Sequence, residues 1–389
     1  MTDVTARSRE ILDALIAFDT TSRESNLGLI GYVRDYLSGL GVESRLVHDE
    51  TGQKANLYAT LGPQDRGGIM LSGHTDVVPV DGQNWATDPF RLTEKDGKLY
   101  GRGTADMKGF IAIALAHLPA MLKRGLKTPV HLALSYDEEI GCVGVRRLID
   151  LMKGMTVKPR MCIIGEPTSM QVIVAHKGKL DASVHVRGFE CHSSLAPQGV
   201  NAIQYAAELI AHIAARARQA QQDGPFDTDF DIAHTTIHTG VIKGGTVINI
   251  VPKDCRFQFE IRNLPQVDPQ KIYAEIQAFA ATELVPRMQA VNKATGIEFA
   301  PGTIYPGLDT RPDEEVVTLA KALAGQNSHS KVAFGTEAGL FQQHARIPTV
   351  ICGPGSITQA HKPDEFLSLD QFAAGHAFMG RLVERVCTG

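Results

Sequence analysis

Gly68-Ile69-Met70-Leu71-Ser72-Gly73 is a short, continuous and mostly apolar stretch that ends directly before His74. A run of this length without polar alternation is typical of a strand buried on both faces, as in a parallel sheet covered by helices. Similar runs at residues 130–136 and 161–165 are each followed by a carboxylic acid. The sequence therefore predicts several buried strands that each end at a polar side chain.

The pattern around these strands indicates two domains. Helices alternate with buried runs at first, which is the rhythm of an α/β fold with a mainly parallel sheet flanked by helices. From Leu180 the apolar residues alternate two-fold with polar neighbours, as in an antiparallel sheet with one wet face, and the α/β rhythm returns after Gly302. We therefore expect a first domain of residues 1–179 and 303–389, with an inserted α+β, ferredoxin-like domain of residues 180–302.

The overall composition excludes several classes of protein. With 43% hydrophobic and 21% charged residues, the chain resembles an ordinary soluble protein with a sizeable core. A formal net charge of -4 provides no general attraction to nucleic acid or to an anionic membrane. The most apolar expected helix, residues 110–122, is too short to span a bilayer, and the charged N-terminus is unlike a signal peptide. The 6 cysteines have no regular spacing, so we expect a reduced, cytoplasmic protein.

The polar residues at the expected strand ends are of the types that bind divalent metal ions. Ligands in open α/β sheets gather outside the carboxyl ends of the strands, so these residues should converge on one crevice. Zinc and its neighbours are bound by imidazole and carboxylate, and a pair of ions about 3.5–4 Å apart can polarise a carbonyl and activate water. The candidate ligands are His74, Asp106, Glu139, Glu166 and His361.

Each candidate also has a simpler interpretation when it is taken alone. A histidine at a strand end is an ordinary polar terminus, and an acid before a helix, such as Asp106, is a helix cap. Glu166-Pro167-Thr168 fits a turn. The conjunction of ligand types where one crevice should form favours a metal centre, but spacing leaves open which ligands share an ion.

Four motifs follow one another along the chain: Gly73-His74-Thr75-Asp76-Val77-Val78-Pro79, Gly101-Arg102-Gly103-Thr104-Ala105-Asp106-Met107-Lys108-Gly109, Asp137-Glu138-Glu139-Ile140-Gly141 and Gly165-Glu166-Pro167-Thr168. They resemble the acetylornithine deacetylase and succinyl-diaminopimelate desuccinylase family of co-catalytic metallohydrolases. The likeness runs from the N-terminal helix to beyond His361. It implies a zinc-aminopeptidase-like catalytic domain with an inserted lid and dimerisation domain.

The resemblance also implies how the ligands divide between two divalent ions. Asp106 would bridge the ions, His74 and Glu166 would hold one, and Glu139 and His361 would hold the other. Zinc is the first expectation, with cobalt and manganese as alternatives, because all three accept this mixed nitrogen and oxygen donor set.

Two further acids acquire roles by the same comparison. Asp76 would orient the imidazole of His74, a common arrangement at zinc histidines. Glu138 would be the general base, which takes a proton from water and later delivers it to the leaving amine. In an extended segment its neighbour Glu139 would face the other way, because successive side chains alternate. The resemblance also implies a cis peptide bond between Asp106 and Met107.

The expected inserted domain contains candidate substrate-binding residues. Residues 188–194 resemble the segment of the family's lid histidine, which enters the active site of the partner subunit, so His192 would stabilise the oxyanion and the protein would be a homodimer. Residues 244–252 and Arg262 resemble the family's substrate-carboxylate region. Arg262 would clamp the α-carboxylate, with Asn249 assisting. Without the resemblance, His192 is a surface residue and Arg262 a salt-bridged strand end.

Two late loops, residues 335–339 and 353–365, resemble those of the members that cleave acetylornithine. Glu337 would then read a cationic side chain such as the δ-ammonium of ornithine, although it also fits the start of a helix. The expected reaction removes the acetyl group from N2-acetyl-L-ornithine. The alternatives are another N-acyl-amino-acid hydrolase, such as a desuccinylase or an aminoacylase, and a metal-binding or amino-acid-sensing homologue without turnover, which would not need Glu138.

Overall fold

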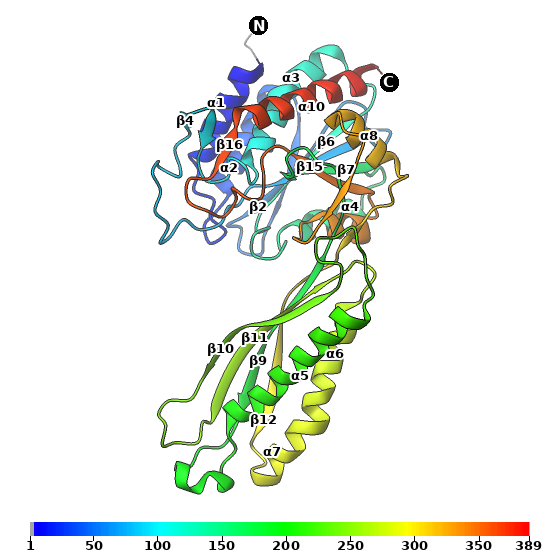
Figure 1. Cartoon of the computed structure of the whole chain (residues 1–389). Coiled ribbons are helices and arrows are strands. Elements are labelled where there is room, and N and C mark those ends of the chain that lie inside the picture. Colours follow the sequence, from blue (N-terminus) through cyan, green and yellow to red (C-terminus); the bar gives the residue numbers. More distant parts are fainter. Residues whose placement is uncertain (1–3, 389) are drawn as a thin grey trace. The chain divides into compact units, whose positions relative to one another are not determined.

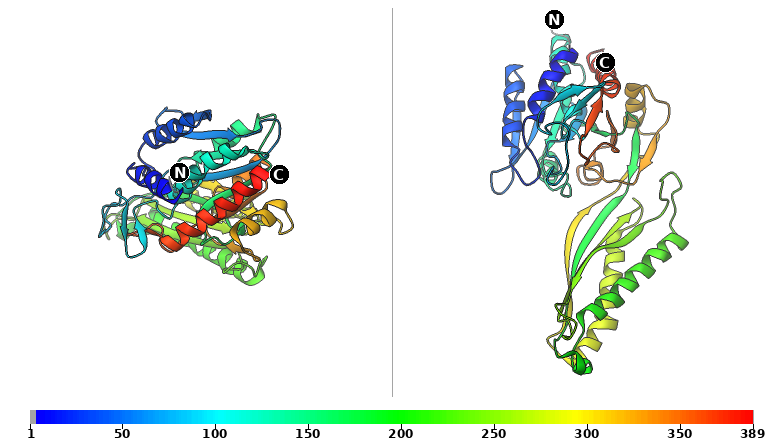
Figure 2. Two further views of the ribbon diagram at one scale, coloured as in Figure 1. Left: turned by 90° about the horizontal axis from the view of Figure 1, so that it is seen from above. Right: turned by 60° about the vertical axis from the view of Figure 1, so that its left-hand side comes forward.

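The structure is a computed structural model that describes residues 4–388, and it divides the chain into two compact units (Figures 1 and 2). The second unit comprises His176–Gly307 and Val332–Gly335, and the rest of the described chain forms the first. We call them the inserted domain and the first domain. The first border lies at His176, slightly before the residue at which the two-fold alternation begins.

The first domain is built on a nine-stranded sheet with the order β1-β2-β6-β3-β7-β15-β8-β13, in which β14 pairs with β8. The four adjacent strands β6, β3, β7 and β15 are parallel to one another, whereas β1, β2 and β8 pair antiparallel. The predicted parallel sheet is thus its centre. The strands are β1 (Ser44–His48), β2 (Ala55–Leu61), β3 (Ile69–His74), β6 (Val130–Ser135), β7 (Met161–Pro167), β8 (Ile173–His176), β13 (Leu308–Asp309), β14 (Ser330–Val332) and β15 (Thr349–Gly353).

Helices flank this sheet (Figure 1). One apolar core joins its strands to α1, α2, α3, α8 and α10. Met70 and Ile164 are equally buried but lie outside that core, because alternate residues of a strand face opposite sides of the sheet. A further helix, α4, packs on β2 and β6. The helices are α1 (Val4–Ile16), α2 (Leu27–Gly39), α3 (Lys108–Arg124), α4 (Val145–Lys153), α8 (Glu315–Ala324), α9 (Ala338–Leu340), η3 (Phe341–Ala345) and α10 (Leu369–Thr388). A small antiparallel sheet consists of β4 (Thr93–Lys95), β5 (Lys98–Tyr100) and β16 (Phe366–Ser368).

The inserted domain is a four-stranded antiparallel sheet with the order β10-β11-β9-β12, packed against helices. Along the chain a strand, a helix, two strands, a helix and a strand follow one another, which is the predicted split β-α-β arrangement. Asp268 caps α6 by accepting a hydrogen bond from the Gln270 amide. The elements are β9 (Gly178–Arg187), η1 (Ser193–Gln198), α5 (Ala202–Asp223), β10 (Thr236–Gly244), β11 (Asp254–Asn263), α6 (Pro269–Phe279), η2 (Ala280–Leu284), α7 (Val285–Val291) and β12 (Gly296–Tyr305).

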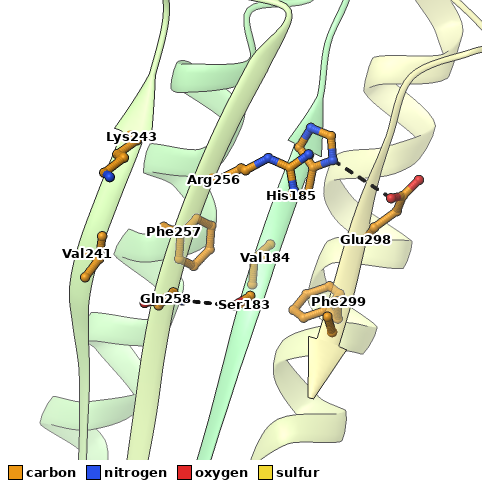
Figure 3. Close-up of a pocket in the computed structure, with 11 residues that line it drawn as sticks. Ser183, Val184, His185, Val241, Lys243, Arg256, Phe257, Gln258, Glu298 and Phe299 are labelled. Atoms are coloured by element: carbon orange, nitrogen blue, oxygen red, sulfur yellow. Dashed lines mark hydrogen bonds and ion pairs between the residues drawn. The ribbon is translucent and has the colours of Figure 1, made fainter. Parts of the chain in front are cut away.

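The face of the inserted-domain sheet that points away from the helices contains a shallow pocket of about 470 Å³ (Figure 3). Two of its ionisable side chains are already paired: His185 lies 2.7 Å from Asp254, and Glu298 lies 2.9 Å from Arg187. The lining consists of strand residues of the sheet, with apolar side chains such as Val241 and Phe299 among them.

Two global properties follow from the described residues. Among residues 4–388, no helix is both long and apolar enough to cross a membrane. All 6 cysteines are free thiols, and most of them are buried.

A chain of hydrogen bonds joins three helices of the first domain. Ser8 donates to the Thr5 carbonyl (2.9 Å), so the His376 ring must donate to the Ser8 hydroxyl through Nε2 (2.8 Å). His376 Nδ1 then accepts from His117 Nε2 at 3.0 Å. This arrangement requires an uncharged His376 ring, and burial together with the nearby His376 lowers the pKa of His117 to about 4.

We predict that this histidine chain makes the protein less stable in mild acid. His117 is uncharged in the folded protein between pH 4 and 6.5 but binds a proton when unfolded, so its contribution to stability is present above pH 6.5 and lost as the pH falls towards 4. Between pH 7 and 5 this one group should remove about 2 kcal/mol from the free energy of unfolding. Urea unfolding of His117→Leu should show a flatter pH dependence than the parent, and the exposed His48→Leu should not.

Candidate metal centre

The parallel strands at the centre of the first-domain sheet bring the candidate ligands to one edge. His74 is the last residue of β3, and Glu166 lies next to the end of β7. Glu139 follows β6, and His361 lies in the loop after β15. Asp106 comes from the loop between β5 and α3. Neighbouring parallel strands end at the same edge of a sheet, so residues far apart in the sequence meet there.

The Asp106 carboxylate lies between two imidazoles. Its Oδ1 is 3.1 Å from His74 Nε2, and its Oδ2 is 3.3 Å from His361 Nε2. Each imidazole has a second carboxylate partner: Glu166 Oε1 lies 3.8 Å from His74, and Glu139 Oε2 lies 3.1 Å from His361. The five residues thus form two imidazole-carboxylate groups that share the two oxygens of one aspartate.

These groups shift one another's proton affinities strongly. Burial alone would lower the pKa of His74, but hydrogen bonds to Asp106 and Asp76 and the nearby charge of Glu166 raise it well above its ordinary value. Hydrogen bonds to Asp106 and Glu139 raise the pKa of His361 to about 10. Burial and then the charge of Asp106 raise the pKa of Glu139 to about 7. The site thus holds more negative charge than its buried setting tolerates without a compensating cation.

The donor set and its spacing fit divalent metal ions. Single ligand atoms of His74, Asp106 and Glu139 all lie within 4.8 Å of one another. Imidazole nitrogen and carboxylate oxygen are the donors that zinc and the neighbouring transition metals accept. A cation on each side of Asp106 would offset the repulsion among the carboxylates. His74 and Glu166 would hold one ion, Glu139 and His361 the other, and Asp106 would contact both.

Asp76 connects the two halves of this site. His74 Nδ1 lies 2.9 Å from the Asp76 carbonyl oxygen and 3.5 Å from its carboxylate. The carboxylate also accepts hydrogen bonds from the backbone amides of Glu138 (3.0 Å) and Glu139 (3.2 Å) and from the Ser22 hydroxyl (2.7 Å). Two successive amides that point to one carboxylate show that this segment is not extended. The condition for strand-like alternation of Glu138 and Glu139 is therefore not met, and Asp76 instead holds the backbone of both.

Glu138 is held beside the candidate ligands. Its Oε1 accepts a weak hydrogen bond from the Cys142 thiol at 3.4 Å. Burial raises the pKa of Glu138 well above its usual value, and the charges of Glu139 and Glu337 add to this effect while His74 opposes it. A carboxylate whose pKa lies above its usual value is suited to take up a proton and release it again.

The Asp106–Met107 peptide bond is cis, as the resemblance implied.

Three predicted residues belong to the inserted domain and are described within it. His192 is exposed, and its Nδ1 accepts a hydrogen bond from the Ser194 amide at 3.2 Å, so the neutral ring has its proton on Nε2. Asn249 is also exposed. Arg262 is half-buried and is already paired, through Nη2 with Glu260 (3.2 Å) and through Nη1 with the Tyr305 hydroxyl (3.0 Å). The simpler interpretation of Arg262, a salt-bridged residue at the end of a strand, therefore matches the structure.

Glu337 lies in the first domain and is only 1% exposed. It immediately precedes the short helix α9, so the helix-start interpretation also describes the structure. Burial raises its pKa to about 7, and among the described residues its Oε1 has no hydrogen-bond partner. An unsatisfied buried carboxylate is costly unless a proton or another cation reaches it.

Several supporting residues were missed by sequence reasoning. Ser22 binds Asp76, and Lys54 binds both the Ser22 carbonyl and the carboxylate of Asp137. Glu365 accepts hydrogen bonds from the loop that carries Asp106. No local pattern marks Ser22 or Lys54, because each acts through a partner that is remote in the sequence. Glu365 alone had a signal, since it lies close after His361 in a motif-like loop.

The fold and the donor set fit a metal-dependent hydrolase. The family model Peptidase family M20/M25/M40 matches residues 70–385, and the chain belongs to this family. The chain is 35% identical over 387 residues to acetylornithine deacetylase from Pasteurella multocida, and this alignment covers 98% of each protein.

Two solved structures share the fold of the whole chain. An M20 family metallo-carboxypeptidase from Sulfolobus solfataricus is 19% identical with a TM-score of 0.77, over 98% of this chain and 99% of that chain. A dinuclear metal-binding peptidase of the same family from Bacillus subtilis is 14% identical with a TM-score of 0.66, over 99% of both.

We predict that Asp106→Ala removes tight binding of both ions, because this carboxylate contacts both imidazole groups. His361→Ala should lose one ion and keep the other. The affinity for Zn²⁺ should fall more than about 100-fold at each affected site, beyond the effect of losing an outer partner. Isothermal titration with Zn²⁺ and metal analysis after gel filtration would measure both. Two tightly bound ions in Asp106→Ala would contradict the bridging role.

Proposed function

We propose that this protein hydrolyses N2-acetyl-L-ornithine to acetate and L-ornithine, a reaction of arginine synthesis, with two bound divalent ions that are most simply zinc. The arrangement of two imidazole-carboxylate groups around the oxygens of Asp106 carries the proposal, because it fits a pair of ions. The full-length similarity to an acetylornithine deacetylase supports the choice of substrate. We further propose a cytoplasmic protein, which the free thiols support.

The chemistry of the proposal depends on Glu138. Two bound ions would polarise the acetyl carbonyl and lower the pKa of a water molecule between them and the substrate. Glu138 would take a proton from this water as it attacks the carbonyl carbon. The same carboxylic acid would then deliver the proton to the α-nitrogen as the amide bond breaks. Asp76 supports this role, because it binds the Glu138 amide and so orients the side chain.

His192 is our candidate donor to the oxyanion. The Ser194 amide occupies Nδ1, so Nε2 carries the ring proton and is available to a negatively charged oxygen. A donor that is already in the required tautomer stabilises the developing charge without reorganisation. In the proposed enzyme His192 acts on the substrate of a partner subunit.

The proposed homodimer forms through the inserted domain. β10 is an edge strand, and edge strands with unpaired backbone groups readily pair with another chain. Val241 and Ile242 on this strand are 45% and 52% exposed, and Ile248 beyond it is 99% exposed. The sheet face with the shallow pocket continues from this edge (Figure 3). A second copy of the chain would cover this apolar surface.

Arg262 and Glu337 are our candidates for substrate recognition. Arg262 would bind the α-carboxylate in place of its present partner Glu260, and the exposed amide of Asn249 would assist. Glu337 would read the δ-ammonium of ornithine from inside the domain. Its lone unsatisfied oxygen supports this role, because a cation brought near it would relieve the cost of burial.

A panel of N-acyl amino acids tests the proposed function. With Zn²⁺ or Co²⁺ restored, kcat/KM for N2-acetyl-L-ornithine should exceed that for N-succinyl-diaminopimelate at least about 100-fold. In Glu337→Gln the preference for acetylornithine over acetylmethionine should fall about tenfold, as one charged interaction is lost. Preference for the succinyl substrate would identify a desuccinylase, and broad activity an aminoacylase. Metal binding without any turnover would identify a non-catalytic homologue.

We predict that Glu138→Ala keeps its metal content but loses turnover. General acid–base catalysis by one group contributes about 10²–10⁴-fold, so kcat should fall by that factor while metal binding stays at the parental level. The exposed Glu50→Ala serves as the control and should leave both unchanged. A near-normal rate in Glu138→Ala would overturn the assignment of the base.

A further inference from the structure

A buried ion pair lies behind the candidate metal centre. Arg102 and Glu365 are each 1% exposed, and Arg102 Nη1 lies 2.7 Å from Glu365 Oε2. Arg102 precedes the candidate bridging residue Asp106 in one loop, and Glu365 follows the candidate ligand His361 in another. The pair therefore joins two loops, each of which carries a candidate ligand.

Glu365 holds the backbone of the Asp106 loop. Its Oε2 accepts hydrogen bonds from Arg102 and from the Gly103 amide (3.1 Å). Its Oε1 accepts from the amides of Ala105 (2.9 Å) and Asp106 itself (3.1 Å). Both carboxylate oxygens are thus saturated by donors of one loop. Charge-assisted hydrogen bonds of this kind are short and directional, so the carboxylate fixes the path of the backbone into Asp106.

Arg102 extends the same network to His361. Its Nη1 also donates to the Lys362 carbonyl (3.3 Å), and its Nη2 donates to Gln83 Oε1 (2.7 Å). Gln83 in turn donates through Nε2 to the His361 carbonyl at 3.1 Å and is oriented by the indole N–H of Trp85 at 3.0 Å. His361 has φ of +64°, a conformation that persists when its surroundings hold it in place.

The energetics of the pair indicate a geometric role. Burying two charges costs several kcal/mol, and a buried ion pair often adds little net stability even when its hydrogen bonds are complete. What the pair supplies is a defined geometry between segments that are remote in the sequence. One hydrogen-bond network binds the backbone amide of Asp106 at one end and the backbone carbonyl of His361 at the other. In the side chains of these two residues, His361 Nε2 lies 3.3 Å from Asp106 Oδ2.

We propose that Glu365 is a positioning residue that sets the spacing between Asp106 and His361 and thereby shapes the cation site formed by Asp106, Glu139 and His361. Arg102 is its partner in this role. The inference rests on the proposed metal centre, and it adds a determinant of metal affinity that contacts neither ion nor substrate.

The test is Co²⁺ and Zn²⁺ binding by Glu365→Gln in the full-length protein. Glutamine keeps the shape but turns an NH₂ group towards amides or the guanidinium, so at least one donor loses its partner. The affinity for one of the two ions should fall about 10–100-fold, the range for partners of metal ligands. The visible absorption of that Co²⁺ should change, and kcat should fall more than KM rises.

Two further variants keep the test decisive. Gln83→Ala removes the connection from Arg102 to the His361 carbonyl, together with the acceptor of the Trp85 indole, but leaves the Arg102–Glu365 pair in place. It should therefore weaken the same ion by a smaller factor even if Glu365→Gln fails to fold. In a double-mutant cycle, Arg102→Gln and Glu365→Gln should be far from additive, because they remove one network. Leu382→Ala removes a core side chain outside this network; it should lower stability but leave both metal affinities unchanged.

The outcomes separate this inference from the proposed function. Parental affinity for both ions in Glu365→Gln and Gln83→Ala would overturn the positioning role while leaving the hydrolase proposal intact. A parent protein that binds fewer than two ions, or that hydrolyses no N-acyl amino acid, would instead contradict the metal centre or the reaction itself.

Discussion

The concentration of carboxylates at one buried sheet edge is the constraint on which the rest of this structure depends. Asp106 lies between His74 and His361, and each imidazole has a further glutamate beside it. Such a group is unfavourable in a protein interior unless cations compensate its charge. The fold must hold the group together, and the four adjacent parallel strands do so by ending at the same edge.

The candidate ligands are held mainly through the backbone of the loops that carry them. The Asp76 carboxylate accepts hydrogen bonds from the backbone amides of Glu138 and Glu139, and the Glu365 carboxylate accepts hydrogen bonds from the amides of Ala105 and Asp106. In both cases a buried carboxylate gathers several N–H donors. A loop held in this way is as well defined as a strand, which a metal site needs because small displacements of a ligand are costly. This explains how irregular segments can supply most of the proposed ligands.

The proposed chemistry divides between the two domains. The first domain holds the candidate metal ligands, the candidate base and Glu337, which are buried or partly buried in the α/β fold except for the exposed His361. The inserted domain holds the candidate oxyanion donor and the candidate carboxylate clamp on an α+β module with its own core.

Sequence by itself determined the α/β class, the inserted split β-α-β module and the set of candidate ligands, since buried strands, two-fold alternation and ligand types at strand ends are local features. Tertiary structure alone decided the antiparallel edges of the large sheet, the non-extended path at Glu138 and the ion pair that occupies Arg262. It also revealed Glu365, whose role depends on a loop more than 250 residues away in the chain. The physical reason is that hydrophobic periodicity is encoded within a few residues, whereas a hydrogen-bond partner or a neighbouring charge is chosen only when the chain has folded.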